Sequence, residues 1–143
     1  MNNEEYVINV NNGNFPNTIK VPLDMPFIDE RGTIQNLWLG NSRSITIITS
    51  NKGAVRANHK HKGDWHAIYV ISGMLSYQVT YDNKVEETII KPGEMIFTPP
   101  DIYHTVIAIE DATFLTINGI IKNHENYMKT MYKTELYNEE KNQ

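Results

Sequence analysis

The chain has 143 residues, 40% of them hydrophobic, which is enough for one hydrophobic core but excludes a second large domain. Its formal net charge is −4 at pH 7, so it has no excess of Lys and Arg with which to bind nucleic acid. The absence of cysteine excludes disulfides, thiolate metal ligands and a cysteine nucleophile. Any bound metal would be held by histidine, carboxylate or water.

The N-terminus is polar and acidic where a secretory signal would be basic and then apolar. The longest apolar runs are far shorter than the roughly 20 residues that cross a bilayer. These features predict a soluble, cytoplasmic protein that does not interact with a membrane.

Residues 1–19 are rich in Asn with scattered apolar side chains, and we expect an N-terminal arm or edge strand there. Residues 20–121 contain short runs of β-branched and aromatic residues, separated by Gly, Pro, Asn and Asp at roughly ten-residue spacing. The strands that this pattern predicts are Ile34–Leu39, Ser44–Thr49, Val55–Asn58, His66–Ile71, Met74–Tyr81, Glu86–Ile90, Glu94–Thr98, Thr105–Ile109 and Thr113–Ile117. Residues 122–143 are predicted to form a short C-terminal helix, over 122–137, or a tail.

Many strands joined by tight turns, with no helical pattern between them, favour a sandwich or closed barrel over an alternating α/β sheet. The fold class is therefore all-β, in one domain.

Four of the five histidines lie in two short segments, 53–73 and 93–104. His59 and His61 are two residues apart, so a strand would point both imidazoles to one face. His66 follows a loop that could bring it back beside them, and His104 follows the turn at Pro99 and Pro100. Such a cluster suits a divalent transition metal such as Zn, Fe, Ni or Mn. A single strand histidine is, however, more often only a partly buried side chain.

The frame around these histidines resembles the cupin family. Gly53-x5-His59-x-His61-x4-His66-x6-Gly73 is similar to the first cupin motif, and Gly93-x5-Pro99-x4-His104 is similar to the second. The resemblance implies a jelly-roll β-barrel and carries the family's metal ligands onto His59, His61 and His104. His66 stands where most cupins have Glu, and we expect it to be a fourth ligand.

A narrower resemblance points to nucleotide-sugar epimerases and isomerases of surface-polysaccharide biosynthesis. Arg56-Ala57-Asn58-His59-Lys60-His61 is similar to an R-G-N-H-x-H stretch of these enzymes, with Ala in place of the usual Gly. Asp29-Glu30-Arg31-Gly32 is similar to a D-x-R-G stretch of deoxysugar 3,5-epimerases. In the epimerase-like stretch His59 would be a catalytic base, a role that excludes simultaneous metal binding.

Four further residues are candidates for the site. Arg56 could clamp a diphosphate or a sugar carbonyl, or could simply be a surface residue of a strand. Trp65 could form an aromatic platform for a substrate, although packing is the more common role. Tyr77 and Tyr103 could act as acids, although strand tyrosines usually belong to the core or to an interface.

The sequence thus predicts a metal-binding cupin that acts as an epimerase or isomerase on a nucleotide-linked 4-keto-6-deoxy sugar. A metal-dependent dioxygenase and a non-enzymatic small-molecule-binding protein are the alternatives, because fold alone does not determine function. A homodimer is expected, since bare sheet edges favour aggregation.

Overall fold

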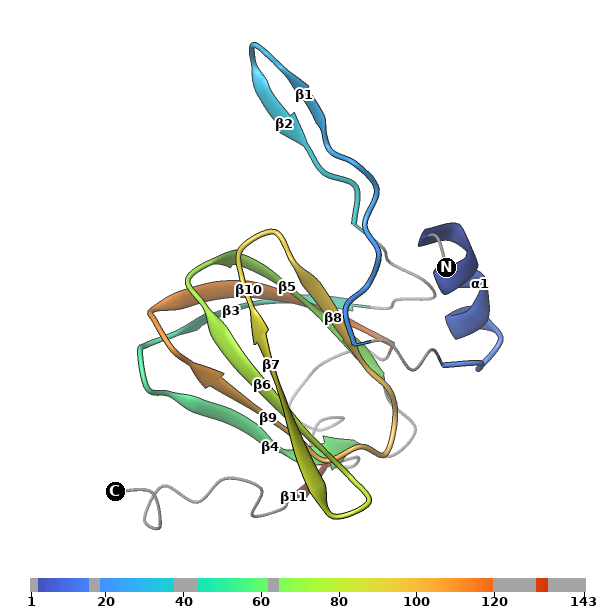
Figure 1. Cartoon of the computed structure of the whole chain (residues 1–143), viewed down its shortest axis with the longest axis vertical. Helices are drawn as coiled ribbons and strands as arrows, with labels where there is room; N and C mark the ends of the chain where they lie inside the picture. Colours follow the sequence, from blue (N-terminus) through green and yellow to red (C-terminus); the bar gives the residue numbers. More distant parts are fainter. Residues whose placement is uncertain (1–2, 16–18, 38–43, 62–64, 120–130, 134–143) are drawn as a thin grey trace.

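The computed structural model describes residues 3–15, 19–37, 44–61, 65–119 and 131–133, with only the backbone for residues 3, 4, 7, 58–61 and 131–133. Two antiparallel sheets form a barrel of jelly-roll type, which confirms the predicted all-β fold (Figure 1). One sheet has the order β3 (Ser44–Ser50), β10 (Ala112–Asn118), β5 (His66–Ser72), β8 (Met95–Thr98). The other has the order β11 (Met131–Lys133), β4 (Val55–His61), β9 (His104–Ala108), β6 (Leu75–Tyr81), β7 (Lys84–Ile90).

The main core lies between the two sheets because alternate residues of each strand point inward. The four-stranded sheet contributes Ile68, Val70, Ile96 and Phe114, and the five-stranded sheet contributes Leu75, Val79, Ile90, Val106 and Ala108, all buried. The predicted strands from residue 44 to residue 118 agree with these elements to within a few residues.

A second apolar cluster covers the outer face of the four-stranded sheet. Helix α1 (Asn3–Asn11) places Tyr6 and Val10, four residues apart, against Phe97 and Ile117. The Tyr6 and Phe97 rings meet edge to face with centroids 6.0 Å apart. The expectation of an extended arm or edge strand over 1–19 is therefore wrong for residues 3–11, where burial of one helical face stabilises a segment of weak helix propensity.

A short hairpin projects from the barrel (Figure 1). It consists of β1 (Phe27–Asp29) and β2 (Gly32–Ile34), with Phe27 opposite Ile34. The strand predicted over Ile34–Leu39 is wrong at residues 35–37, which are not extended in a sheet, and residues 38–39 lie outside the described part of the chain.

The C-terminal helix predicted over 122–137 is wrong at residues 131–133, because these form β11 and pair with β4 from His59 to His61. The rest of that range lies outside the described residues. Among the described residues, no helix is long and apolar enough to cross a membrane.

Tight turns close one end of the barrel, and Gly73 lies in the turn between β5 and β6. Its φ of +82° is in the left-handed region, and an added Cβ would lie 2.3 Å from the Asp111 carbonyl oxygen and 2.7 Å from the Ala112 Cα. Gly53 also has a positive φ, of +85°, but a Cβ added there would meet nothing within 4 Å. Glycine is thus required at position 73 both by the positive φ and by the lack of space for a Cβ.

Candidate active site

The interior of the barrel changes character from one end to the other. Toward the tight turns it is apolar, with Ala108, Ala112 and Phe114 in the core. At the opposite end, where β5, β9 and β3 begin and β8 and β10 end, the inward side chains are polar and buried: His66, Thr98, His104, Thr116 and Asn118. Buried polar groups at one end of an otherwise apolar interior mark a candidate site.

Two histidines face each other across this polar end. His66 begins β5 in one sheet and His104 begins β9 in the other. Their ring centroids are 5.0 Å apart, and the residues are only 8% and 2% exposed. The structure therefore brings together two of the four predicted metal ligands from opposite sides of the barrel.

The His104 ring is oriented by the chain just before it. Its Nδ1 lies 3.1 Å from the carbonyl oxygen of Ile102. A carbonyl can only accept, so Nδ1 carries the proton and Nε2 of the neutral ring carries the lone pair. That tautomer suits both a metal ligand and a general base.

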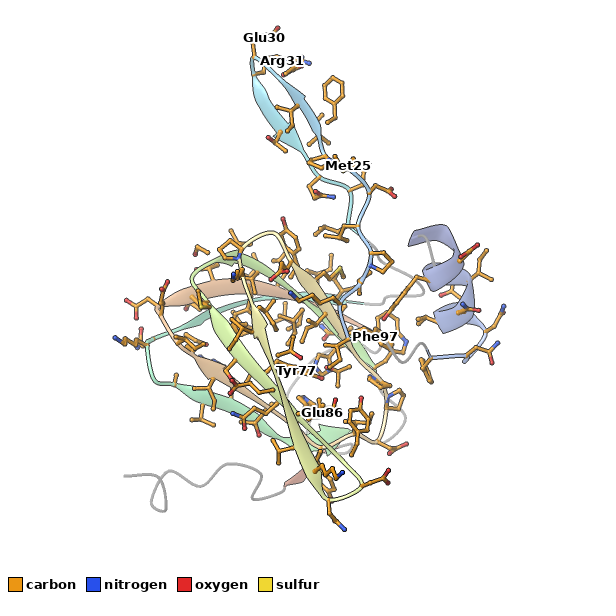
Figure 2. The ribbon with its side chains drawn as sticks, in the orientation of Figure 1. Met25, Glu30, Arg31, Tyr77, Glu86 and Phe97 are labelled. Atoms are coloured by element: carbon orange, nitrogen blue, oxygen red, sulfur yellow. The ribbon has the colours of Figure 1, made fainter. Side chains whose placement is uncertain are left out.

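Tyr77 reaches across from β6 toward the four-stranded sheet, and Figure 2 shows it inside the barrel. Its hydroxyl forms a 2.5 Å hydrogen bond with the Thr98 Oγ1, and its ring centroid lies 6.1 Å from that of His104. Burial raises the pKa of the Tyr77 phenol well above its usual value, outweighing the opposing effect of the Thr98 hydrogen bond. Tyr77 is therefore a neutral hydroxyl at physiological pH, able to donate a proton or a hydrogen bond.

A β-bulge in β4 determines where His59 lies. Ala57 has a φ of +66°, and the register shifts so that Ala57 pairs with Thr105 and His59 with His104. Asn58 is the additional residue. In a regular strand, Arg56 and His59 would point to opposite faces of the sheet. The bulge interrupts this alternation, and His59 lies directly opposite His104 in the neighbouring strand. The side chains of His59 and His61 lie outside the described part of the structure.

This bulge gives a physical reason for the glycine that epimerase-like sequences carry at the position of Ala57. Residues with a Cβ are disfavoured at positive φ, whereas glycine is not. The chain keeps the bulge with an alanine, at a cost in conformational energy.

Arg56 lies opposite Val106 of β9, and its side chain reaches the end of β3 at Ser50, away from His66 and His104. Its Nε donates to Ser50 Oγ at 2.5 Å and one Nη donates to the Thr49 carbonyl at 2.9 Å. Ser50 is six residues, roughly 20 Å, along β3 from Ser44, which borders the polar end. The placement favours the alternative in which Arg56 is an exposed surface residue of the strand, and its hydrogen bonds link β4 to β3.

Trp65 packs on the outer face of the four-stranded sheet. Its ring lies 5.7 Å from that of Phe97, and a Cβ on Gly119 would lie 2.6 Å from its Nε1. His66, the next residue, points inward. The placement of Trp65 favours the packing role. Tyr103 is half-buried directly before His104, and its carbonyl accepts a hydrogen bond from the Thr80 amide at 3.1 Å.

Thr98 and Asn118 were not predicted from the sequence, although both belong to the polar end. Asn118 is fully buried and its Nδ2 lies within hydrogen-bonding distance of Ser44 and Thr46. Among the described residues its Oδ1 has no hydrogen-bond partner. The signal that could have found both residues is a polar residue at an inward position of an otherwise apolar strand.

The separation of the His66 and His104 ring centroids is compatible with two ligands of one transition metal ion. Two imidazoles bound to one tetrahedral ion at about 2.0–2.1 Å have ring centres about 5 Å apart, which matches the separation of His66 and His104. No group of three or more potential ligands is present among the described side chains, which do not include those of His59 and His61.

A family model described as Cupin domain matches residues 46–118, just over half of the chain. The chain therefore belongs to the cupin family. No curated protein sequence matches the chain.

Solved structures with the same fold include sugar-modifying enzymes. The 3,4-ketoisomerase QdtA of Thermoanaerobacterium thermosaccharolyticum, an H51N mutant in complex with TDP-4-keto-6-deoxyglucose, has a TM-score of 0.66 and 13% identity, over 81% of this chain and 85% of that chain. The dTDP-4-dehydrorhamnose 3,5-epimerase of Sulfolobus tokodaii has a TM-score of 0.63 and 18% identity, over 76% and 72% of the two chains. The TDP-quinovose 3,4-ketoisomerase WlaRB of Campylobacter jejuni has a TM-score of 0.62 and 14% identity, over 70% and 83%. At these identities the likeness shows a shared fold.

Proposed function

We propose that this cupin is an isomerase or epimerase of a nucleotide-linked 4-keto-6-deoxy sugar. The observation that carries the proposal is the buried juxtaposition of a neutral tyrosine hydroxyl with two imidazoles, His66 and His104, at one end of the barrel. Enolisation beside a ketone needs such a set, in which one group accepts a carbon-bound proton and another donates to oxygen or carbon. The resemblance to structures of ketoisomerases and epimerases supports the same chemistry.

The first step is common to both reactions. A base removes the proton on C3, next to the C4 ketone, and the C–H electron pair forms the C3=C4 bond while the ketone oxygen becomes an enolate. Return of a proton to the opposite face of C3 gives the epimer. Return of a proton to C4, with protonation of the enolate oxygen and loss of the C3 hydroxyl proton, moves the ketone to C3 and leaves a hydroxyl group on C4. Repetition at C5 would extend epimerisation to that carbon.

The residues divide into a base and an acid. The imidazole of His59 or His104 accepts the carbon-bound proton, and the carbonyl of Ile102 holds the His104 ring in a suitable tautomer. The Tyr77 hydroxyl donates toward the developing oxyanion or the enolate carbon, and Thr98 fixes its direction. The apolar core beyond the polar end excludes water and strengthens these interactions.

As the alternative to a histidine base, we propose that His59, His61, His66 and His104 hold one divalent transition metal, Zn, Fe, Ni or Mn. When bound, such an ion polarises a ketone oxygen as a Lewis acid. If His59 is a ligand, His104 and His66 are ligands with it and the carbon-bound proton must pass to another group. If His59 is the base, the histidine set is a proton relay instead.

Solvent exchange tests the proposed reaction. Incubation in D₂O with dTDP-, UDP- or GDP-linked 4-keto-6-deoxy sugars should introduce deuterium at C3 or C5, detected by mass spectrometry. His59→Ala should stop the exchange, whereas Ile47→Thr, on the outer face of β3, should not. Absence of exchange with every such substrate, in folded and metal-loaded protein, would favour the oxygenase or binding-protein alternative.

Metal quantification on the untagged protein tests the ligand set. We expect one ion per chain, lost in the double variant His59→Ala/His61→Ala. We expect weaker binding in His66→Ala, and retained binding with a preference for harder ions in His66→Glu. Stoichiometric metal in the double variant would overturn the ligand assignment. Unchanged affinity in His66→Ala would remove His66 from it.

A further inference from the structure

A row of inward-facing polar residues crosses the four-stranded sheet at the polar end of the barrel. Thr98 of β8 lies opposite His66 of β5. Asn118 of β10 lies opposite His66 on one side and opposite Ser44 of β3 on the other. The four strands are neighbours in the sheet (Figure 1) and are about 4.8 Å apart, so Asn118 is about 10 Å from Thr98 along the row. The row is therefore long enough to contact a sugar ring at two separate points.

The side-chain amide of Asn118 is oriented by its donor end. Its Nδ2 lies 3.3 Å from the Oγ of Ser44 and 3.2 Å from the Oγ1 of Thr46, both on β3. It also lies 3.4 Å from the Ser44 carbonyl oxygen and 3.5 Å from that of Thr116. Carbonyl oxygens only accept hydrogen bonds, so the NH₂ group, and not the amide oxygen, faces them. The Oδ1 atom consequently faces away from β3.

The Oδ1 atom of Asn118 needs a donor. The residue is 0% exposed, and within the described part of the chain no group donates to this oxygen. A buried acceptor without a donor costs free energy, so the site favours a ligand that supplies one. Ketone oxygens and ionised phosphate oxygens cannot do so, because they only accept hydrogen bonds. A hydroxyl group can donate, and it is uncharged like the amide itself.

The proposed substrate class offers two hydroxyl groups on its ring. In a nucleotide-linked 4-keto-6-deoxy sugar, C1 carries the nucleotide, C4 carries the ketone and C6 lacks a hydroxyl, which leaves those on C2 and C3. Tyr77, the proposed donor to the ketone oxygen, is hydrogen-bonded to Thr98 at one end of the row. The C3 hydroxyl is on the carbon next to the ketone, whereas C2 is one carbon further away. Because Asn118 lies two strands away from Thr98, the C2 hydroxyl is the better match for its amide oxygen.

We infer that the amide oxygen of Asn118 accepts a hydrogen bond from the C2 hydroxyl of the sugar. This contact and the hydrogen bond from Tyr77 hold the ring at two points, with the C4 ketone on the side of Tyr77 and His104. The inference rests on the proposed function, because it requires a 4-keto sugar in the polar end of the barrel. It makes Asn118 a specificity-determining residue that selects sugars with a free C2 hydroxyl.

Binding of matched sugars tests this contact. The probes are dTDP-, UDP- and GDP-linked 4-keto-6-deoxy hexoses and their 2-deoxy counterparts, with each Kd measured by isothermal titration calorimetry. The wild type should bind the 2-deoxy sugar at least about tenfold more weakly than its parent, because the Asn118 oxygen is then left without a donor. Asn118→Ala should bind the two sugars with Kd values within about twofold of each other. Asn51→Ala removes an exposed amide between β3 and β4, and as the matched control it should discriminate like the wild type.

Asn118→Ser provides a second variant in case the alanine variant does not fold. Its hydroxyl can keep a hydrogen bond to β3 but is too short to replace the amide oxygen, so it should also lose the discrimination, with circular dichroism verifying the fold. Equal wild-type affinity for the parent and 2-deoxy sugars would overturn the inference, since water would then satisfy the amide oxygen equally well. Unchanged discrimination in a folded Asn118 variant would assign the C2 hydroxyl to another group and would also overturn it.

The same measurements separate this contact from the proposed reaction. Deuterium exchange together with equal binding of the 2-deoxy sugar would overturn the contact and support the reaction. The expected discrimination without any exchange would support the contact and overturn the reaction. Failure of folded, metal-loaded wild type to bind any parent sugar would overturn both.

Discussion

The two ends of the barrel interior are built from the same strands but serve different purposes. β10 carries Ala112 and Phe114 toward the tight turns and Thr116 and Asn118 toward the other end. The apolar end contributes most of the burial energy, while the polar end costs free energy unless its groups find partners. Under the proposed function, stability and chemistry are divided along each strand. Substitutions at the apolar end should then lower stability and leave activity, whereas substitutions at the polar end should lower activity and change stability less.

The largest effect is expected at His104. His104→Gln removes the imidazole whether it accepts a proton or binds a metal, and should lower the deuterium-exchange rate by about 10²–10⁴-fold. The melting temperature should change little by comparison. An unchanged exchange rate in a folded variant would exclude His104 from the chemistry.

Tyr77→Phe should separate the contribution of the hydroxyl from the contribution of the ring. Loss of the acid should again lower exchange by about 10²–10⁴-fold, while the unpaired Thr98 hydroxyl costs about 1–3 kcal/mol in the free energy of unfolding. The double variant Tyr77→Phe/Thr98→Val should recover much of that stability, because both hydrogen-bonding groups are then absent, but not the activity. Recovery of activity in the double variant would contradict an acid role for Tyr77.

The apolar end should show the reverse pattern. Phe114→Ala should lower the free energy of unfolding by about 3–5 kcal/mol, measured by urea denaturation, through lost burial and the cavity left behind. Below its melting temperature, the variant should exchange deuterium at a rate close to that of the wild type. A selective loss of exchange without destabilisation would show that the two ends are not independent.

A smaller gain is expected at Ala57. Glycine relieves the cost of the positive φ but adds freedom to the unfolded chain, so Ala57→Gly should stabilise the fold by about 0.5–1 kcal/mol. Thermal unfolding should show a rise of about 1–4 °C. A clear loss of stability would mean that the alanine side chain contributes packing that outweighs the strain.

The smallest effect is expected outside the barrel interior. Lys20 hydrogen bonds to Glu94 at 2.6 Å and holds the pKa of this carboxyl below its ordinary value of 4.5. The pair therefore stabilises the fold above pH 4.5, and this contribution is lost as the pH falls through the folded-state pKa. Glu94→Gln should cost less than about 1 kcal/mol at pH 7, because both side chains are solvent-exposed in part. A difference that persists at acidic pH would have another cause.

The strands between residues 44 and 118 could be predicted because apolar and polar residues alternate along them, and this alternation follows which side chains are buried. Helix α1 could not, since its stability comes from Tyr6 and Val10 packing on Phe97, a contact distant in sequence. The bulge at Ala57 could not be predicted either, because an alanine in the sequence does not indicate a positive φ.

The site was predictable in part for a related reason. Histidines are rare and grouped, so His66 and His104 stood out, and the structure brings them together. Thr98 and Asn118 belong to common residue types, and only the three-dimensional alternation shows that they face inward at the same end. Arg56 was ambiguous because its direction depends on the bulge.

The two glycines of the first cupin motif, Gly53 and Gly73, differ in whether a side chain could replace them. This difference affects how distant relatives can be recognised. At Gly53 an added Cβ would find open space, and asparagine tolerates a positive φ, whereas at Gly73 every Cβ would collide with the backbone of Asp111 and Ala112. Diverging sequences can therefore lose the first glycine long before they lose the second. A search pattern that weights Gly73 more heavily than Gly53 should retrieve distant members of the family that an evenly weighted pattern passes over.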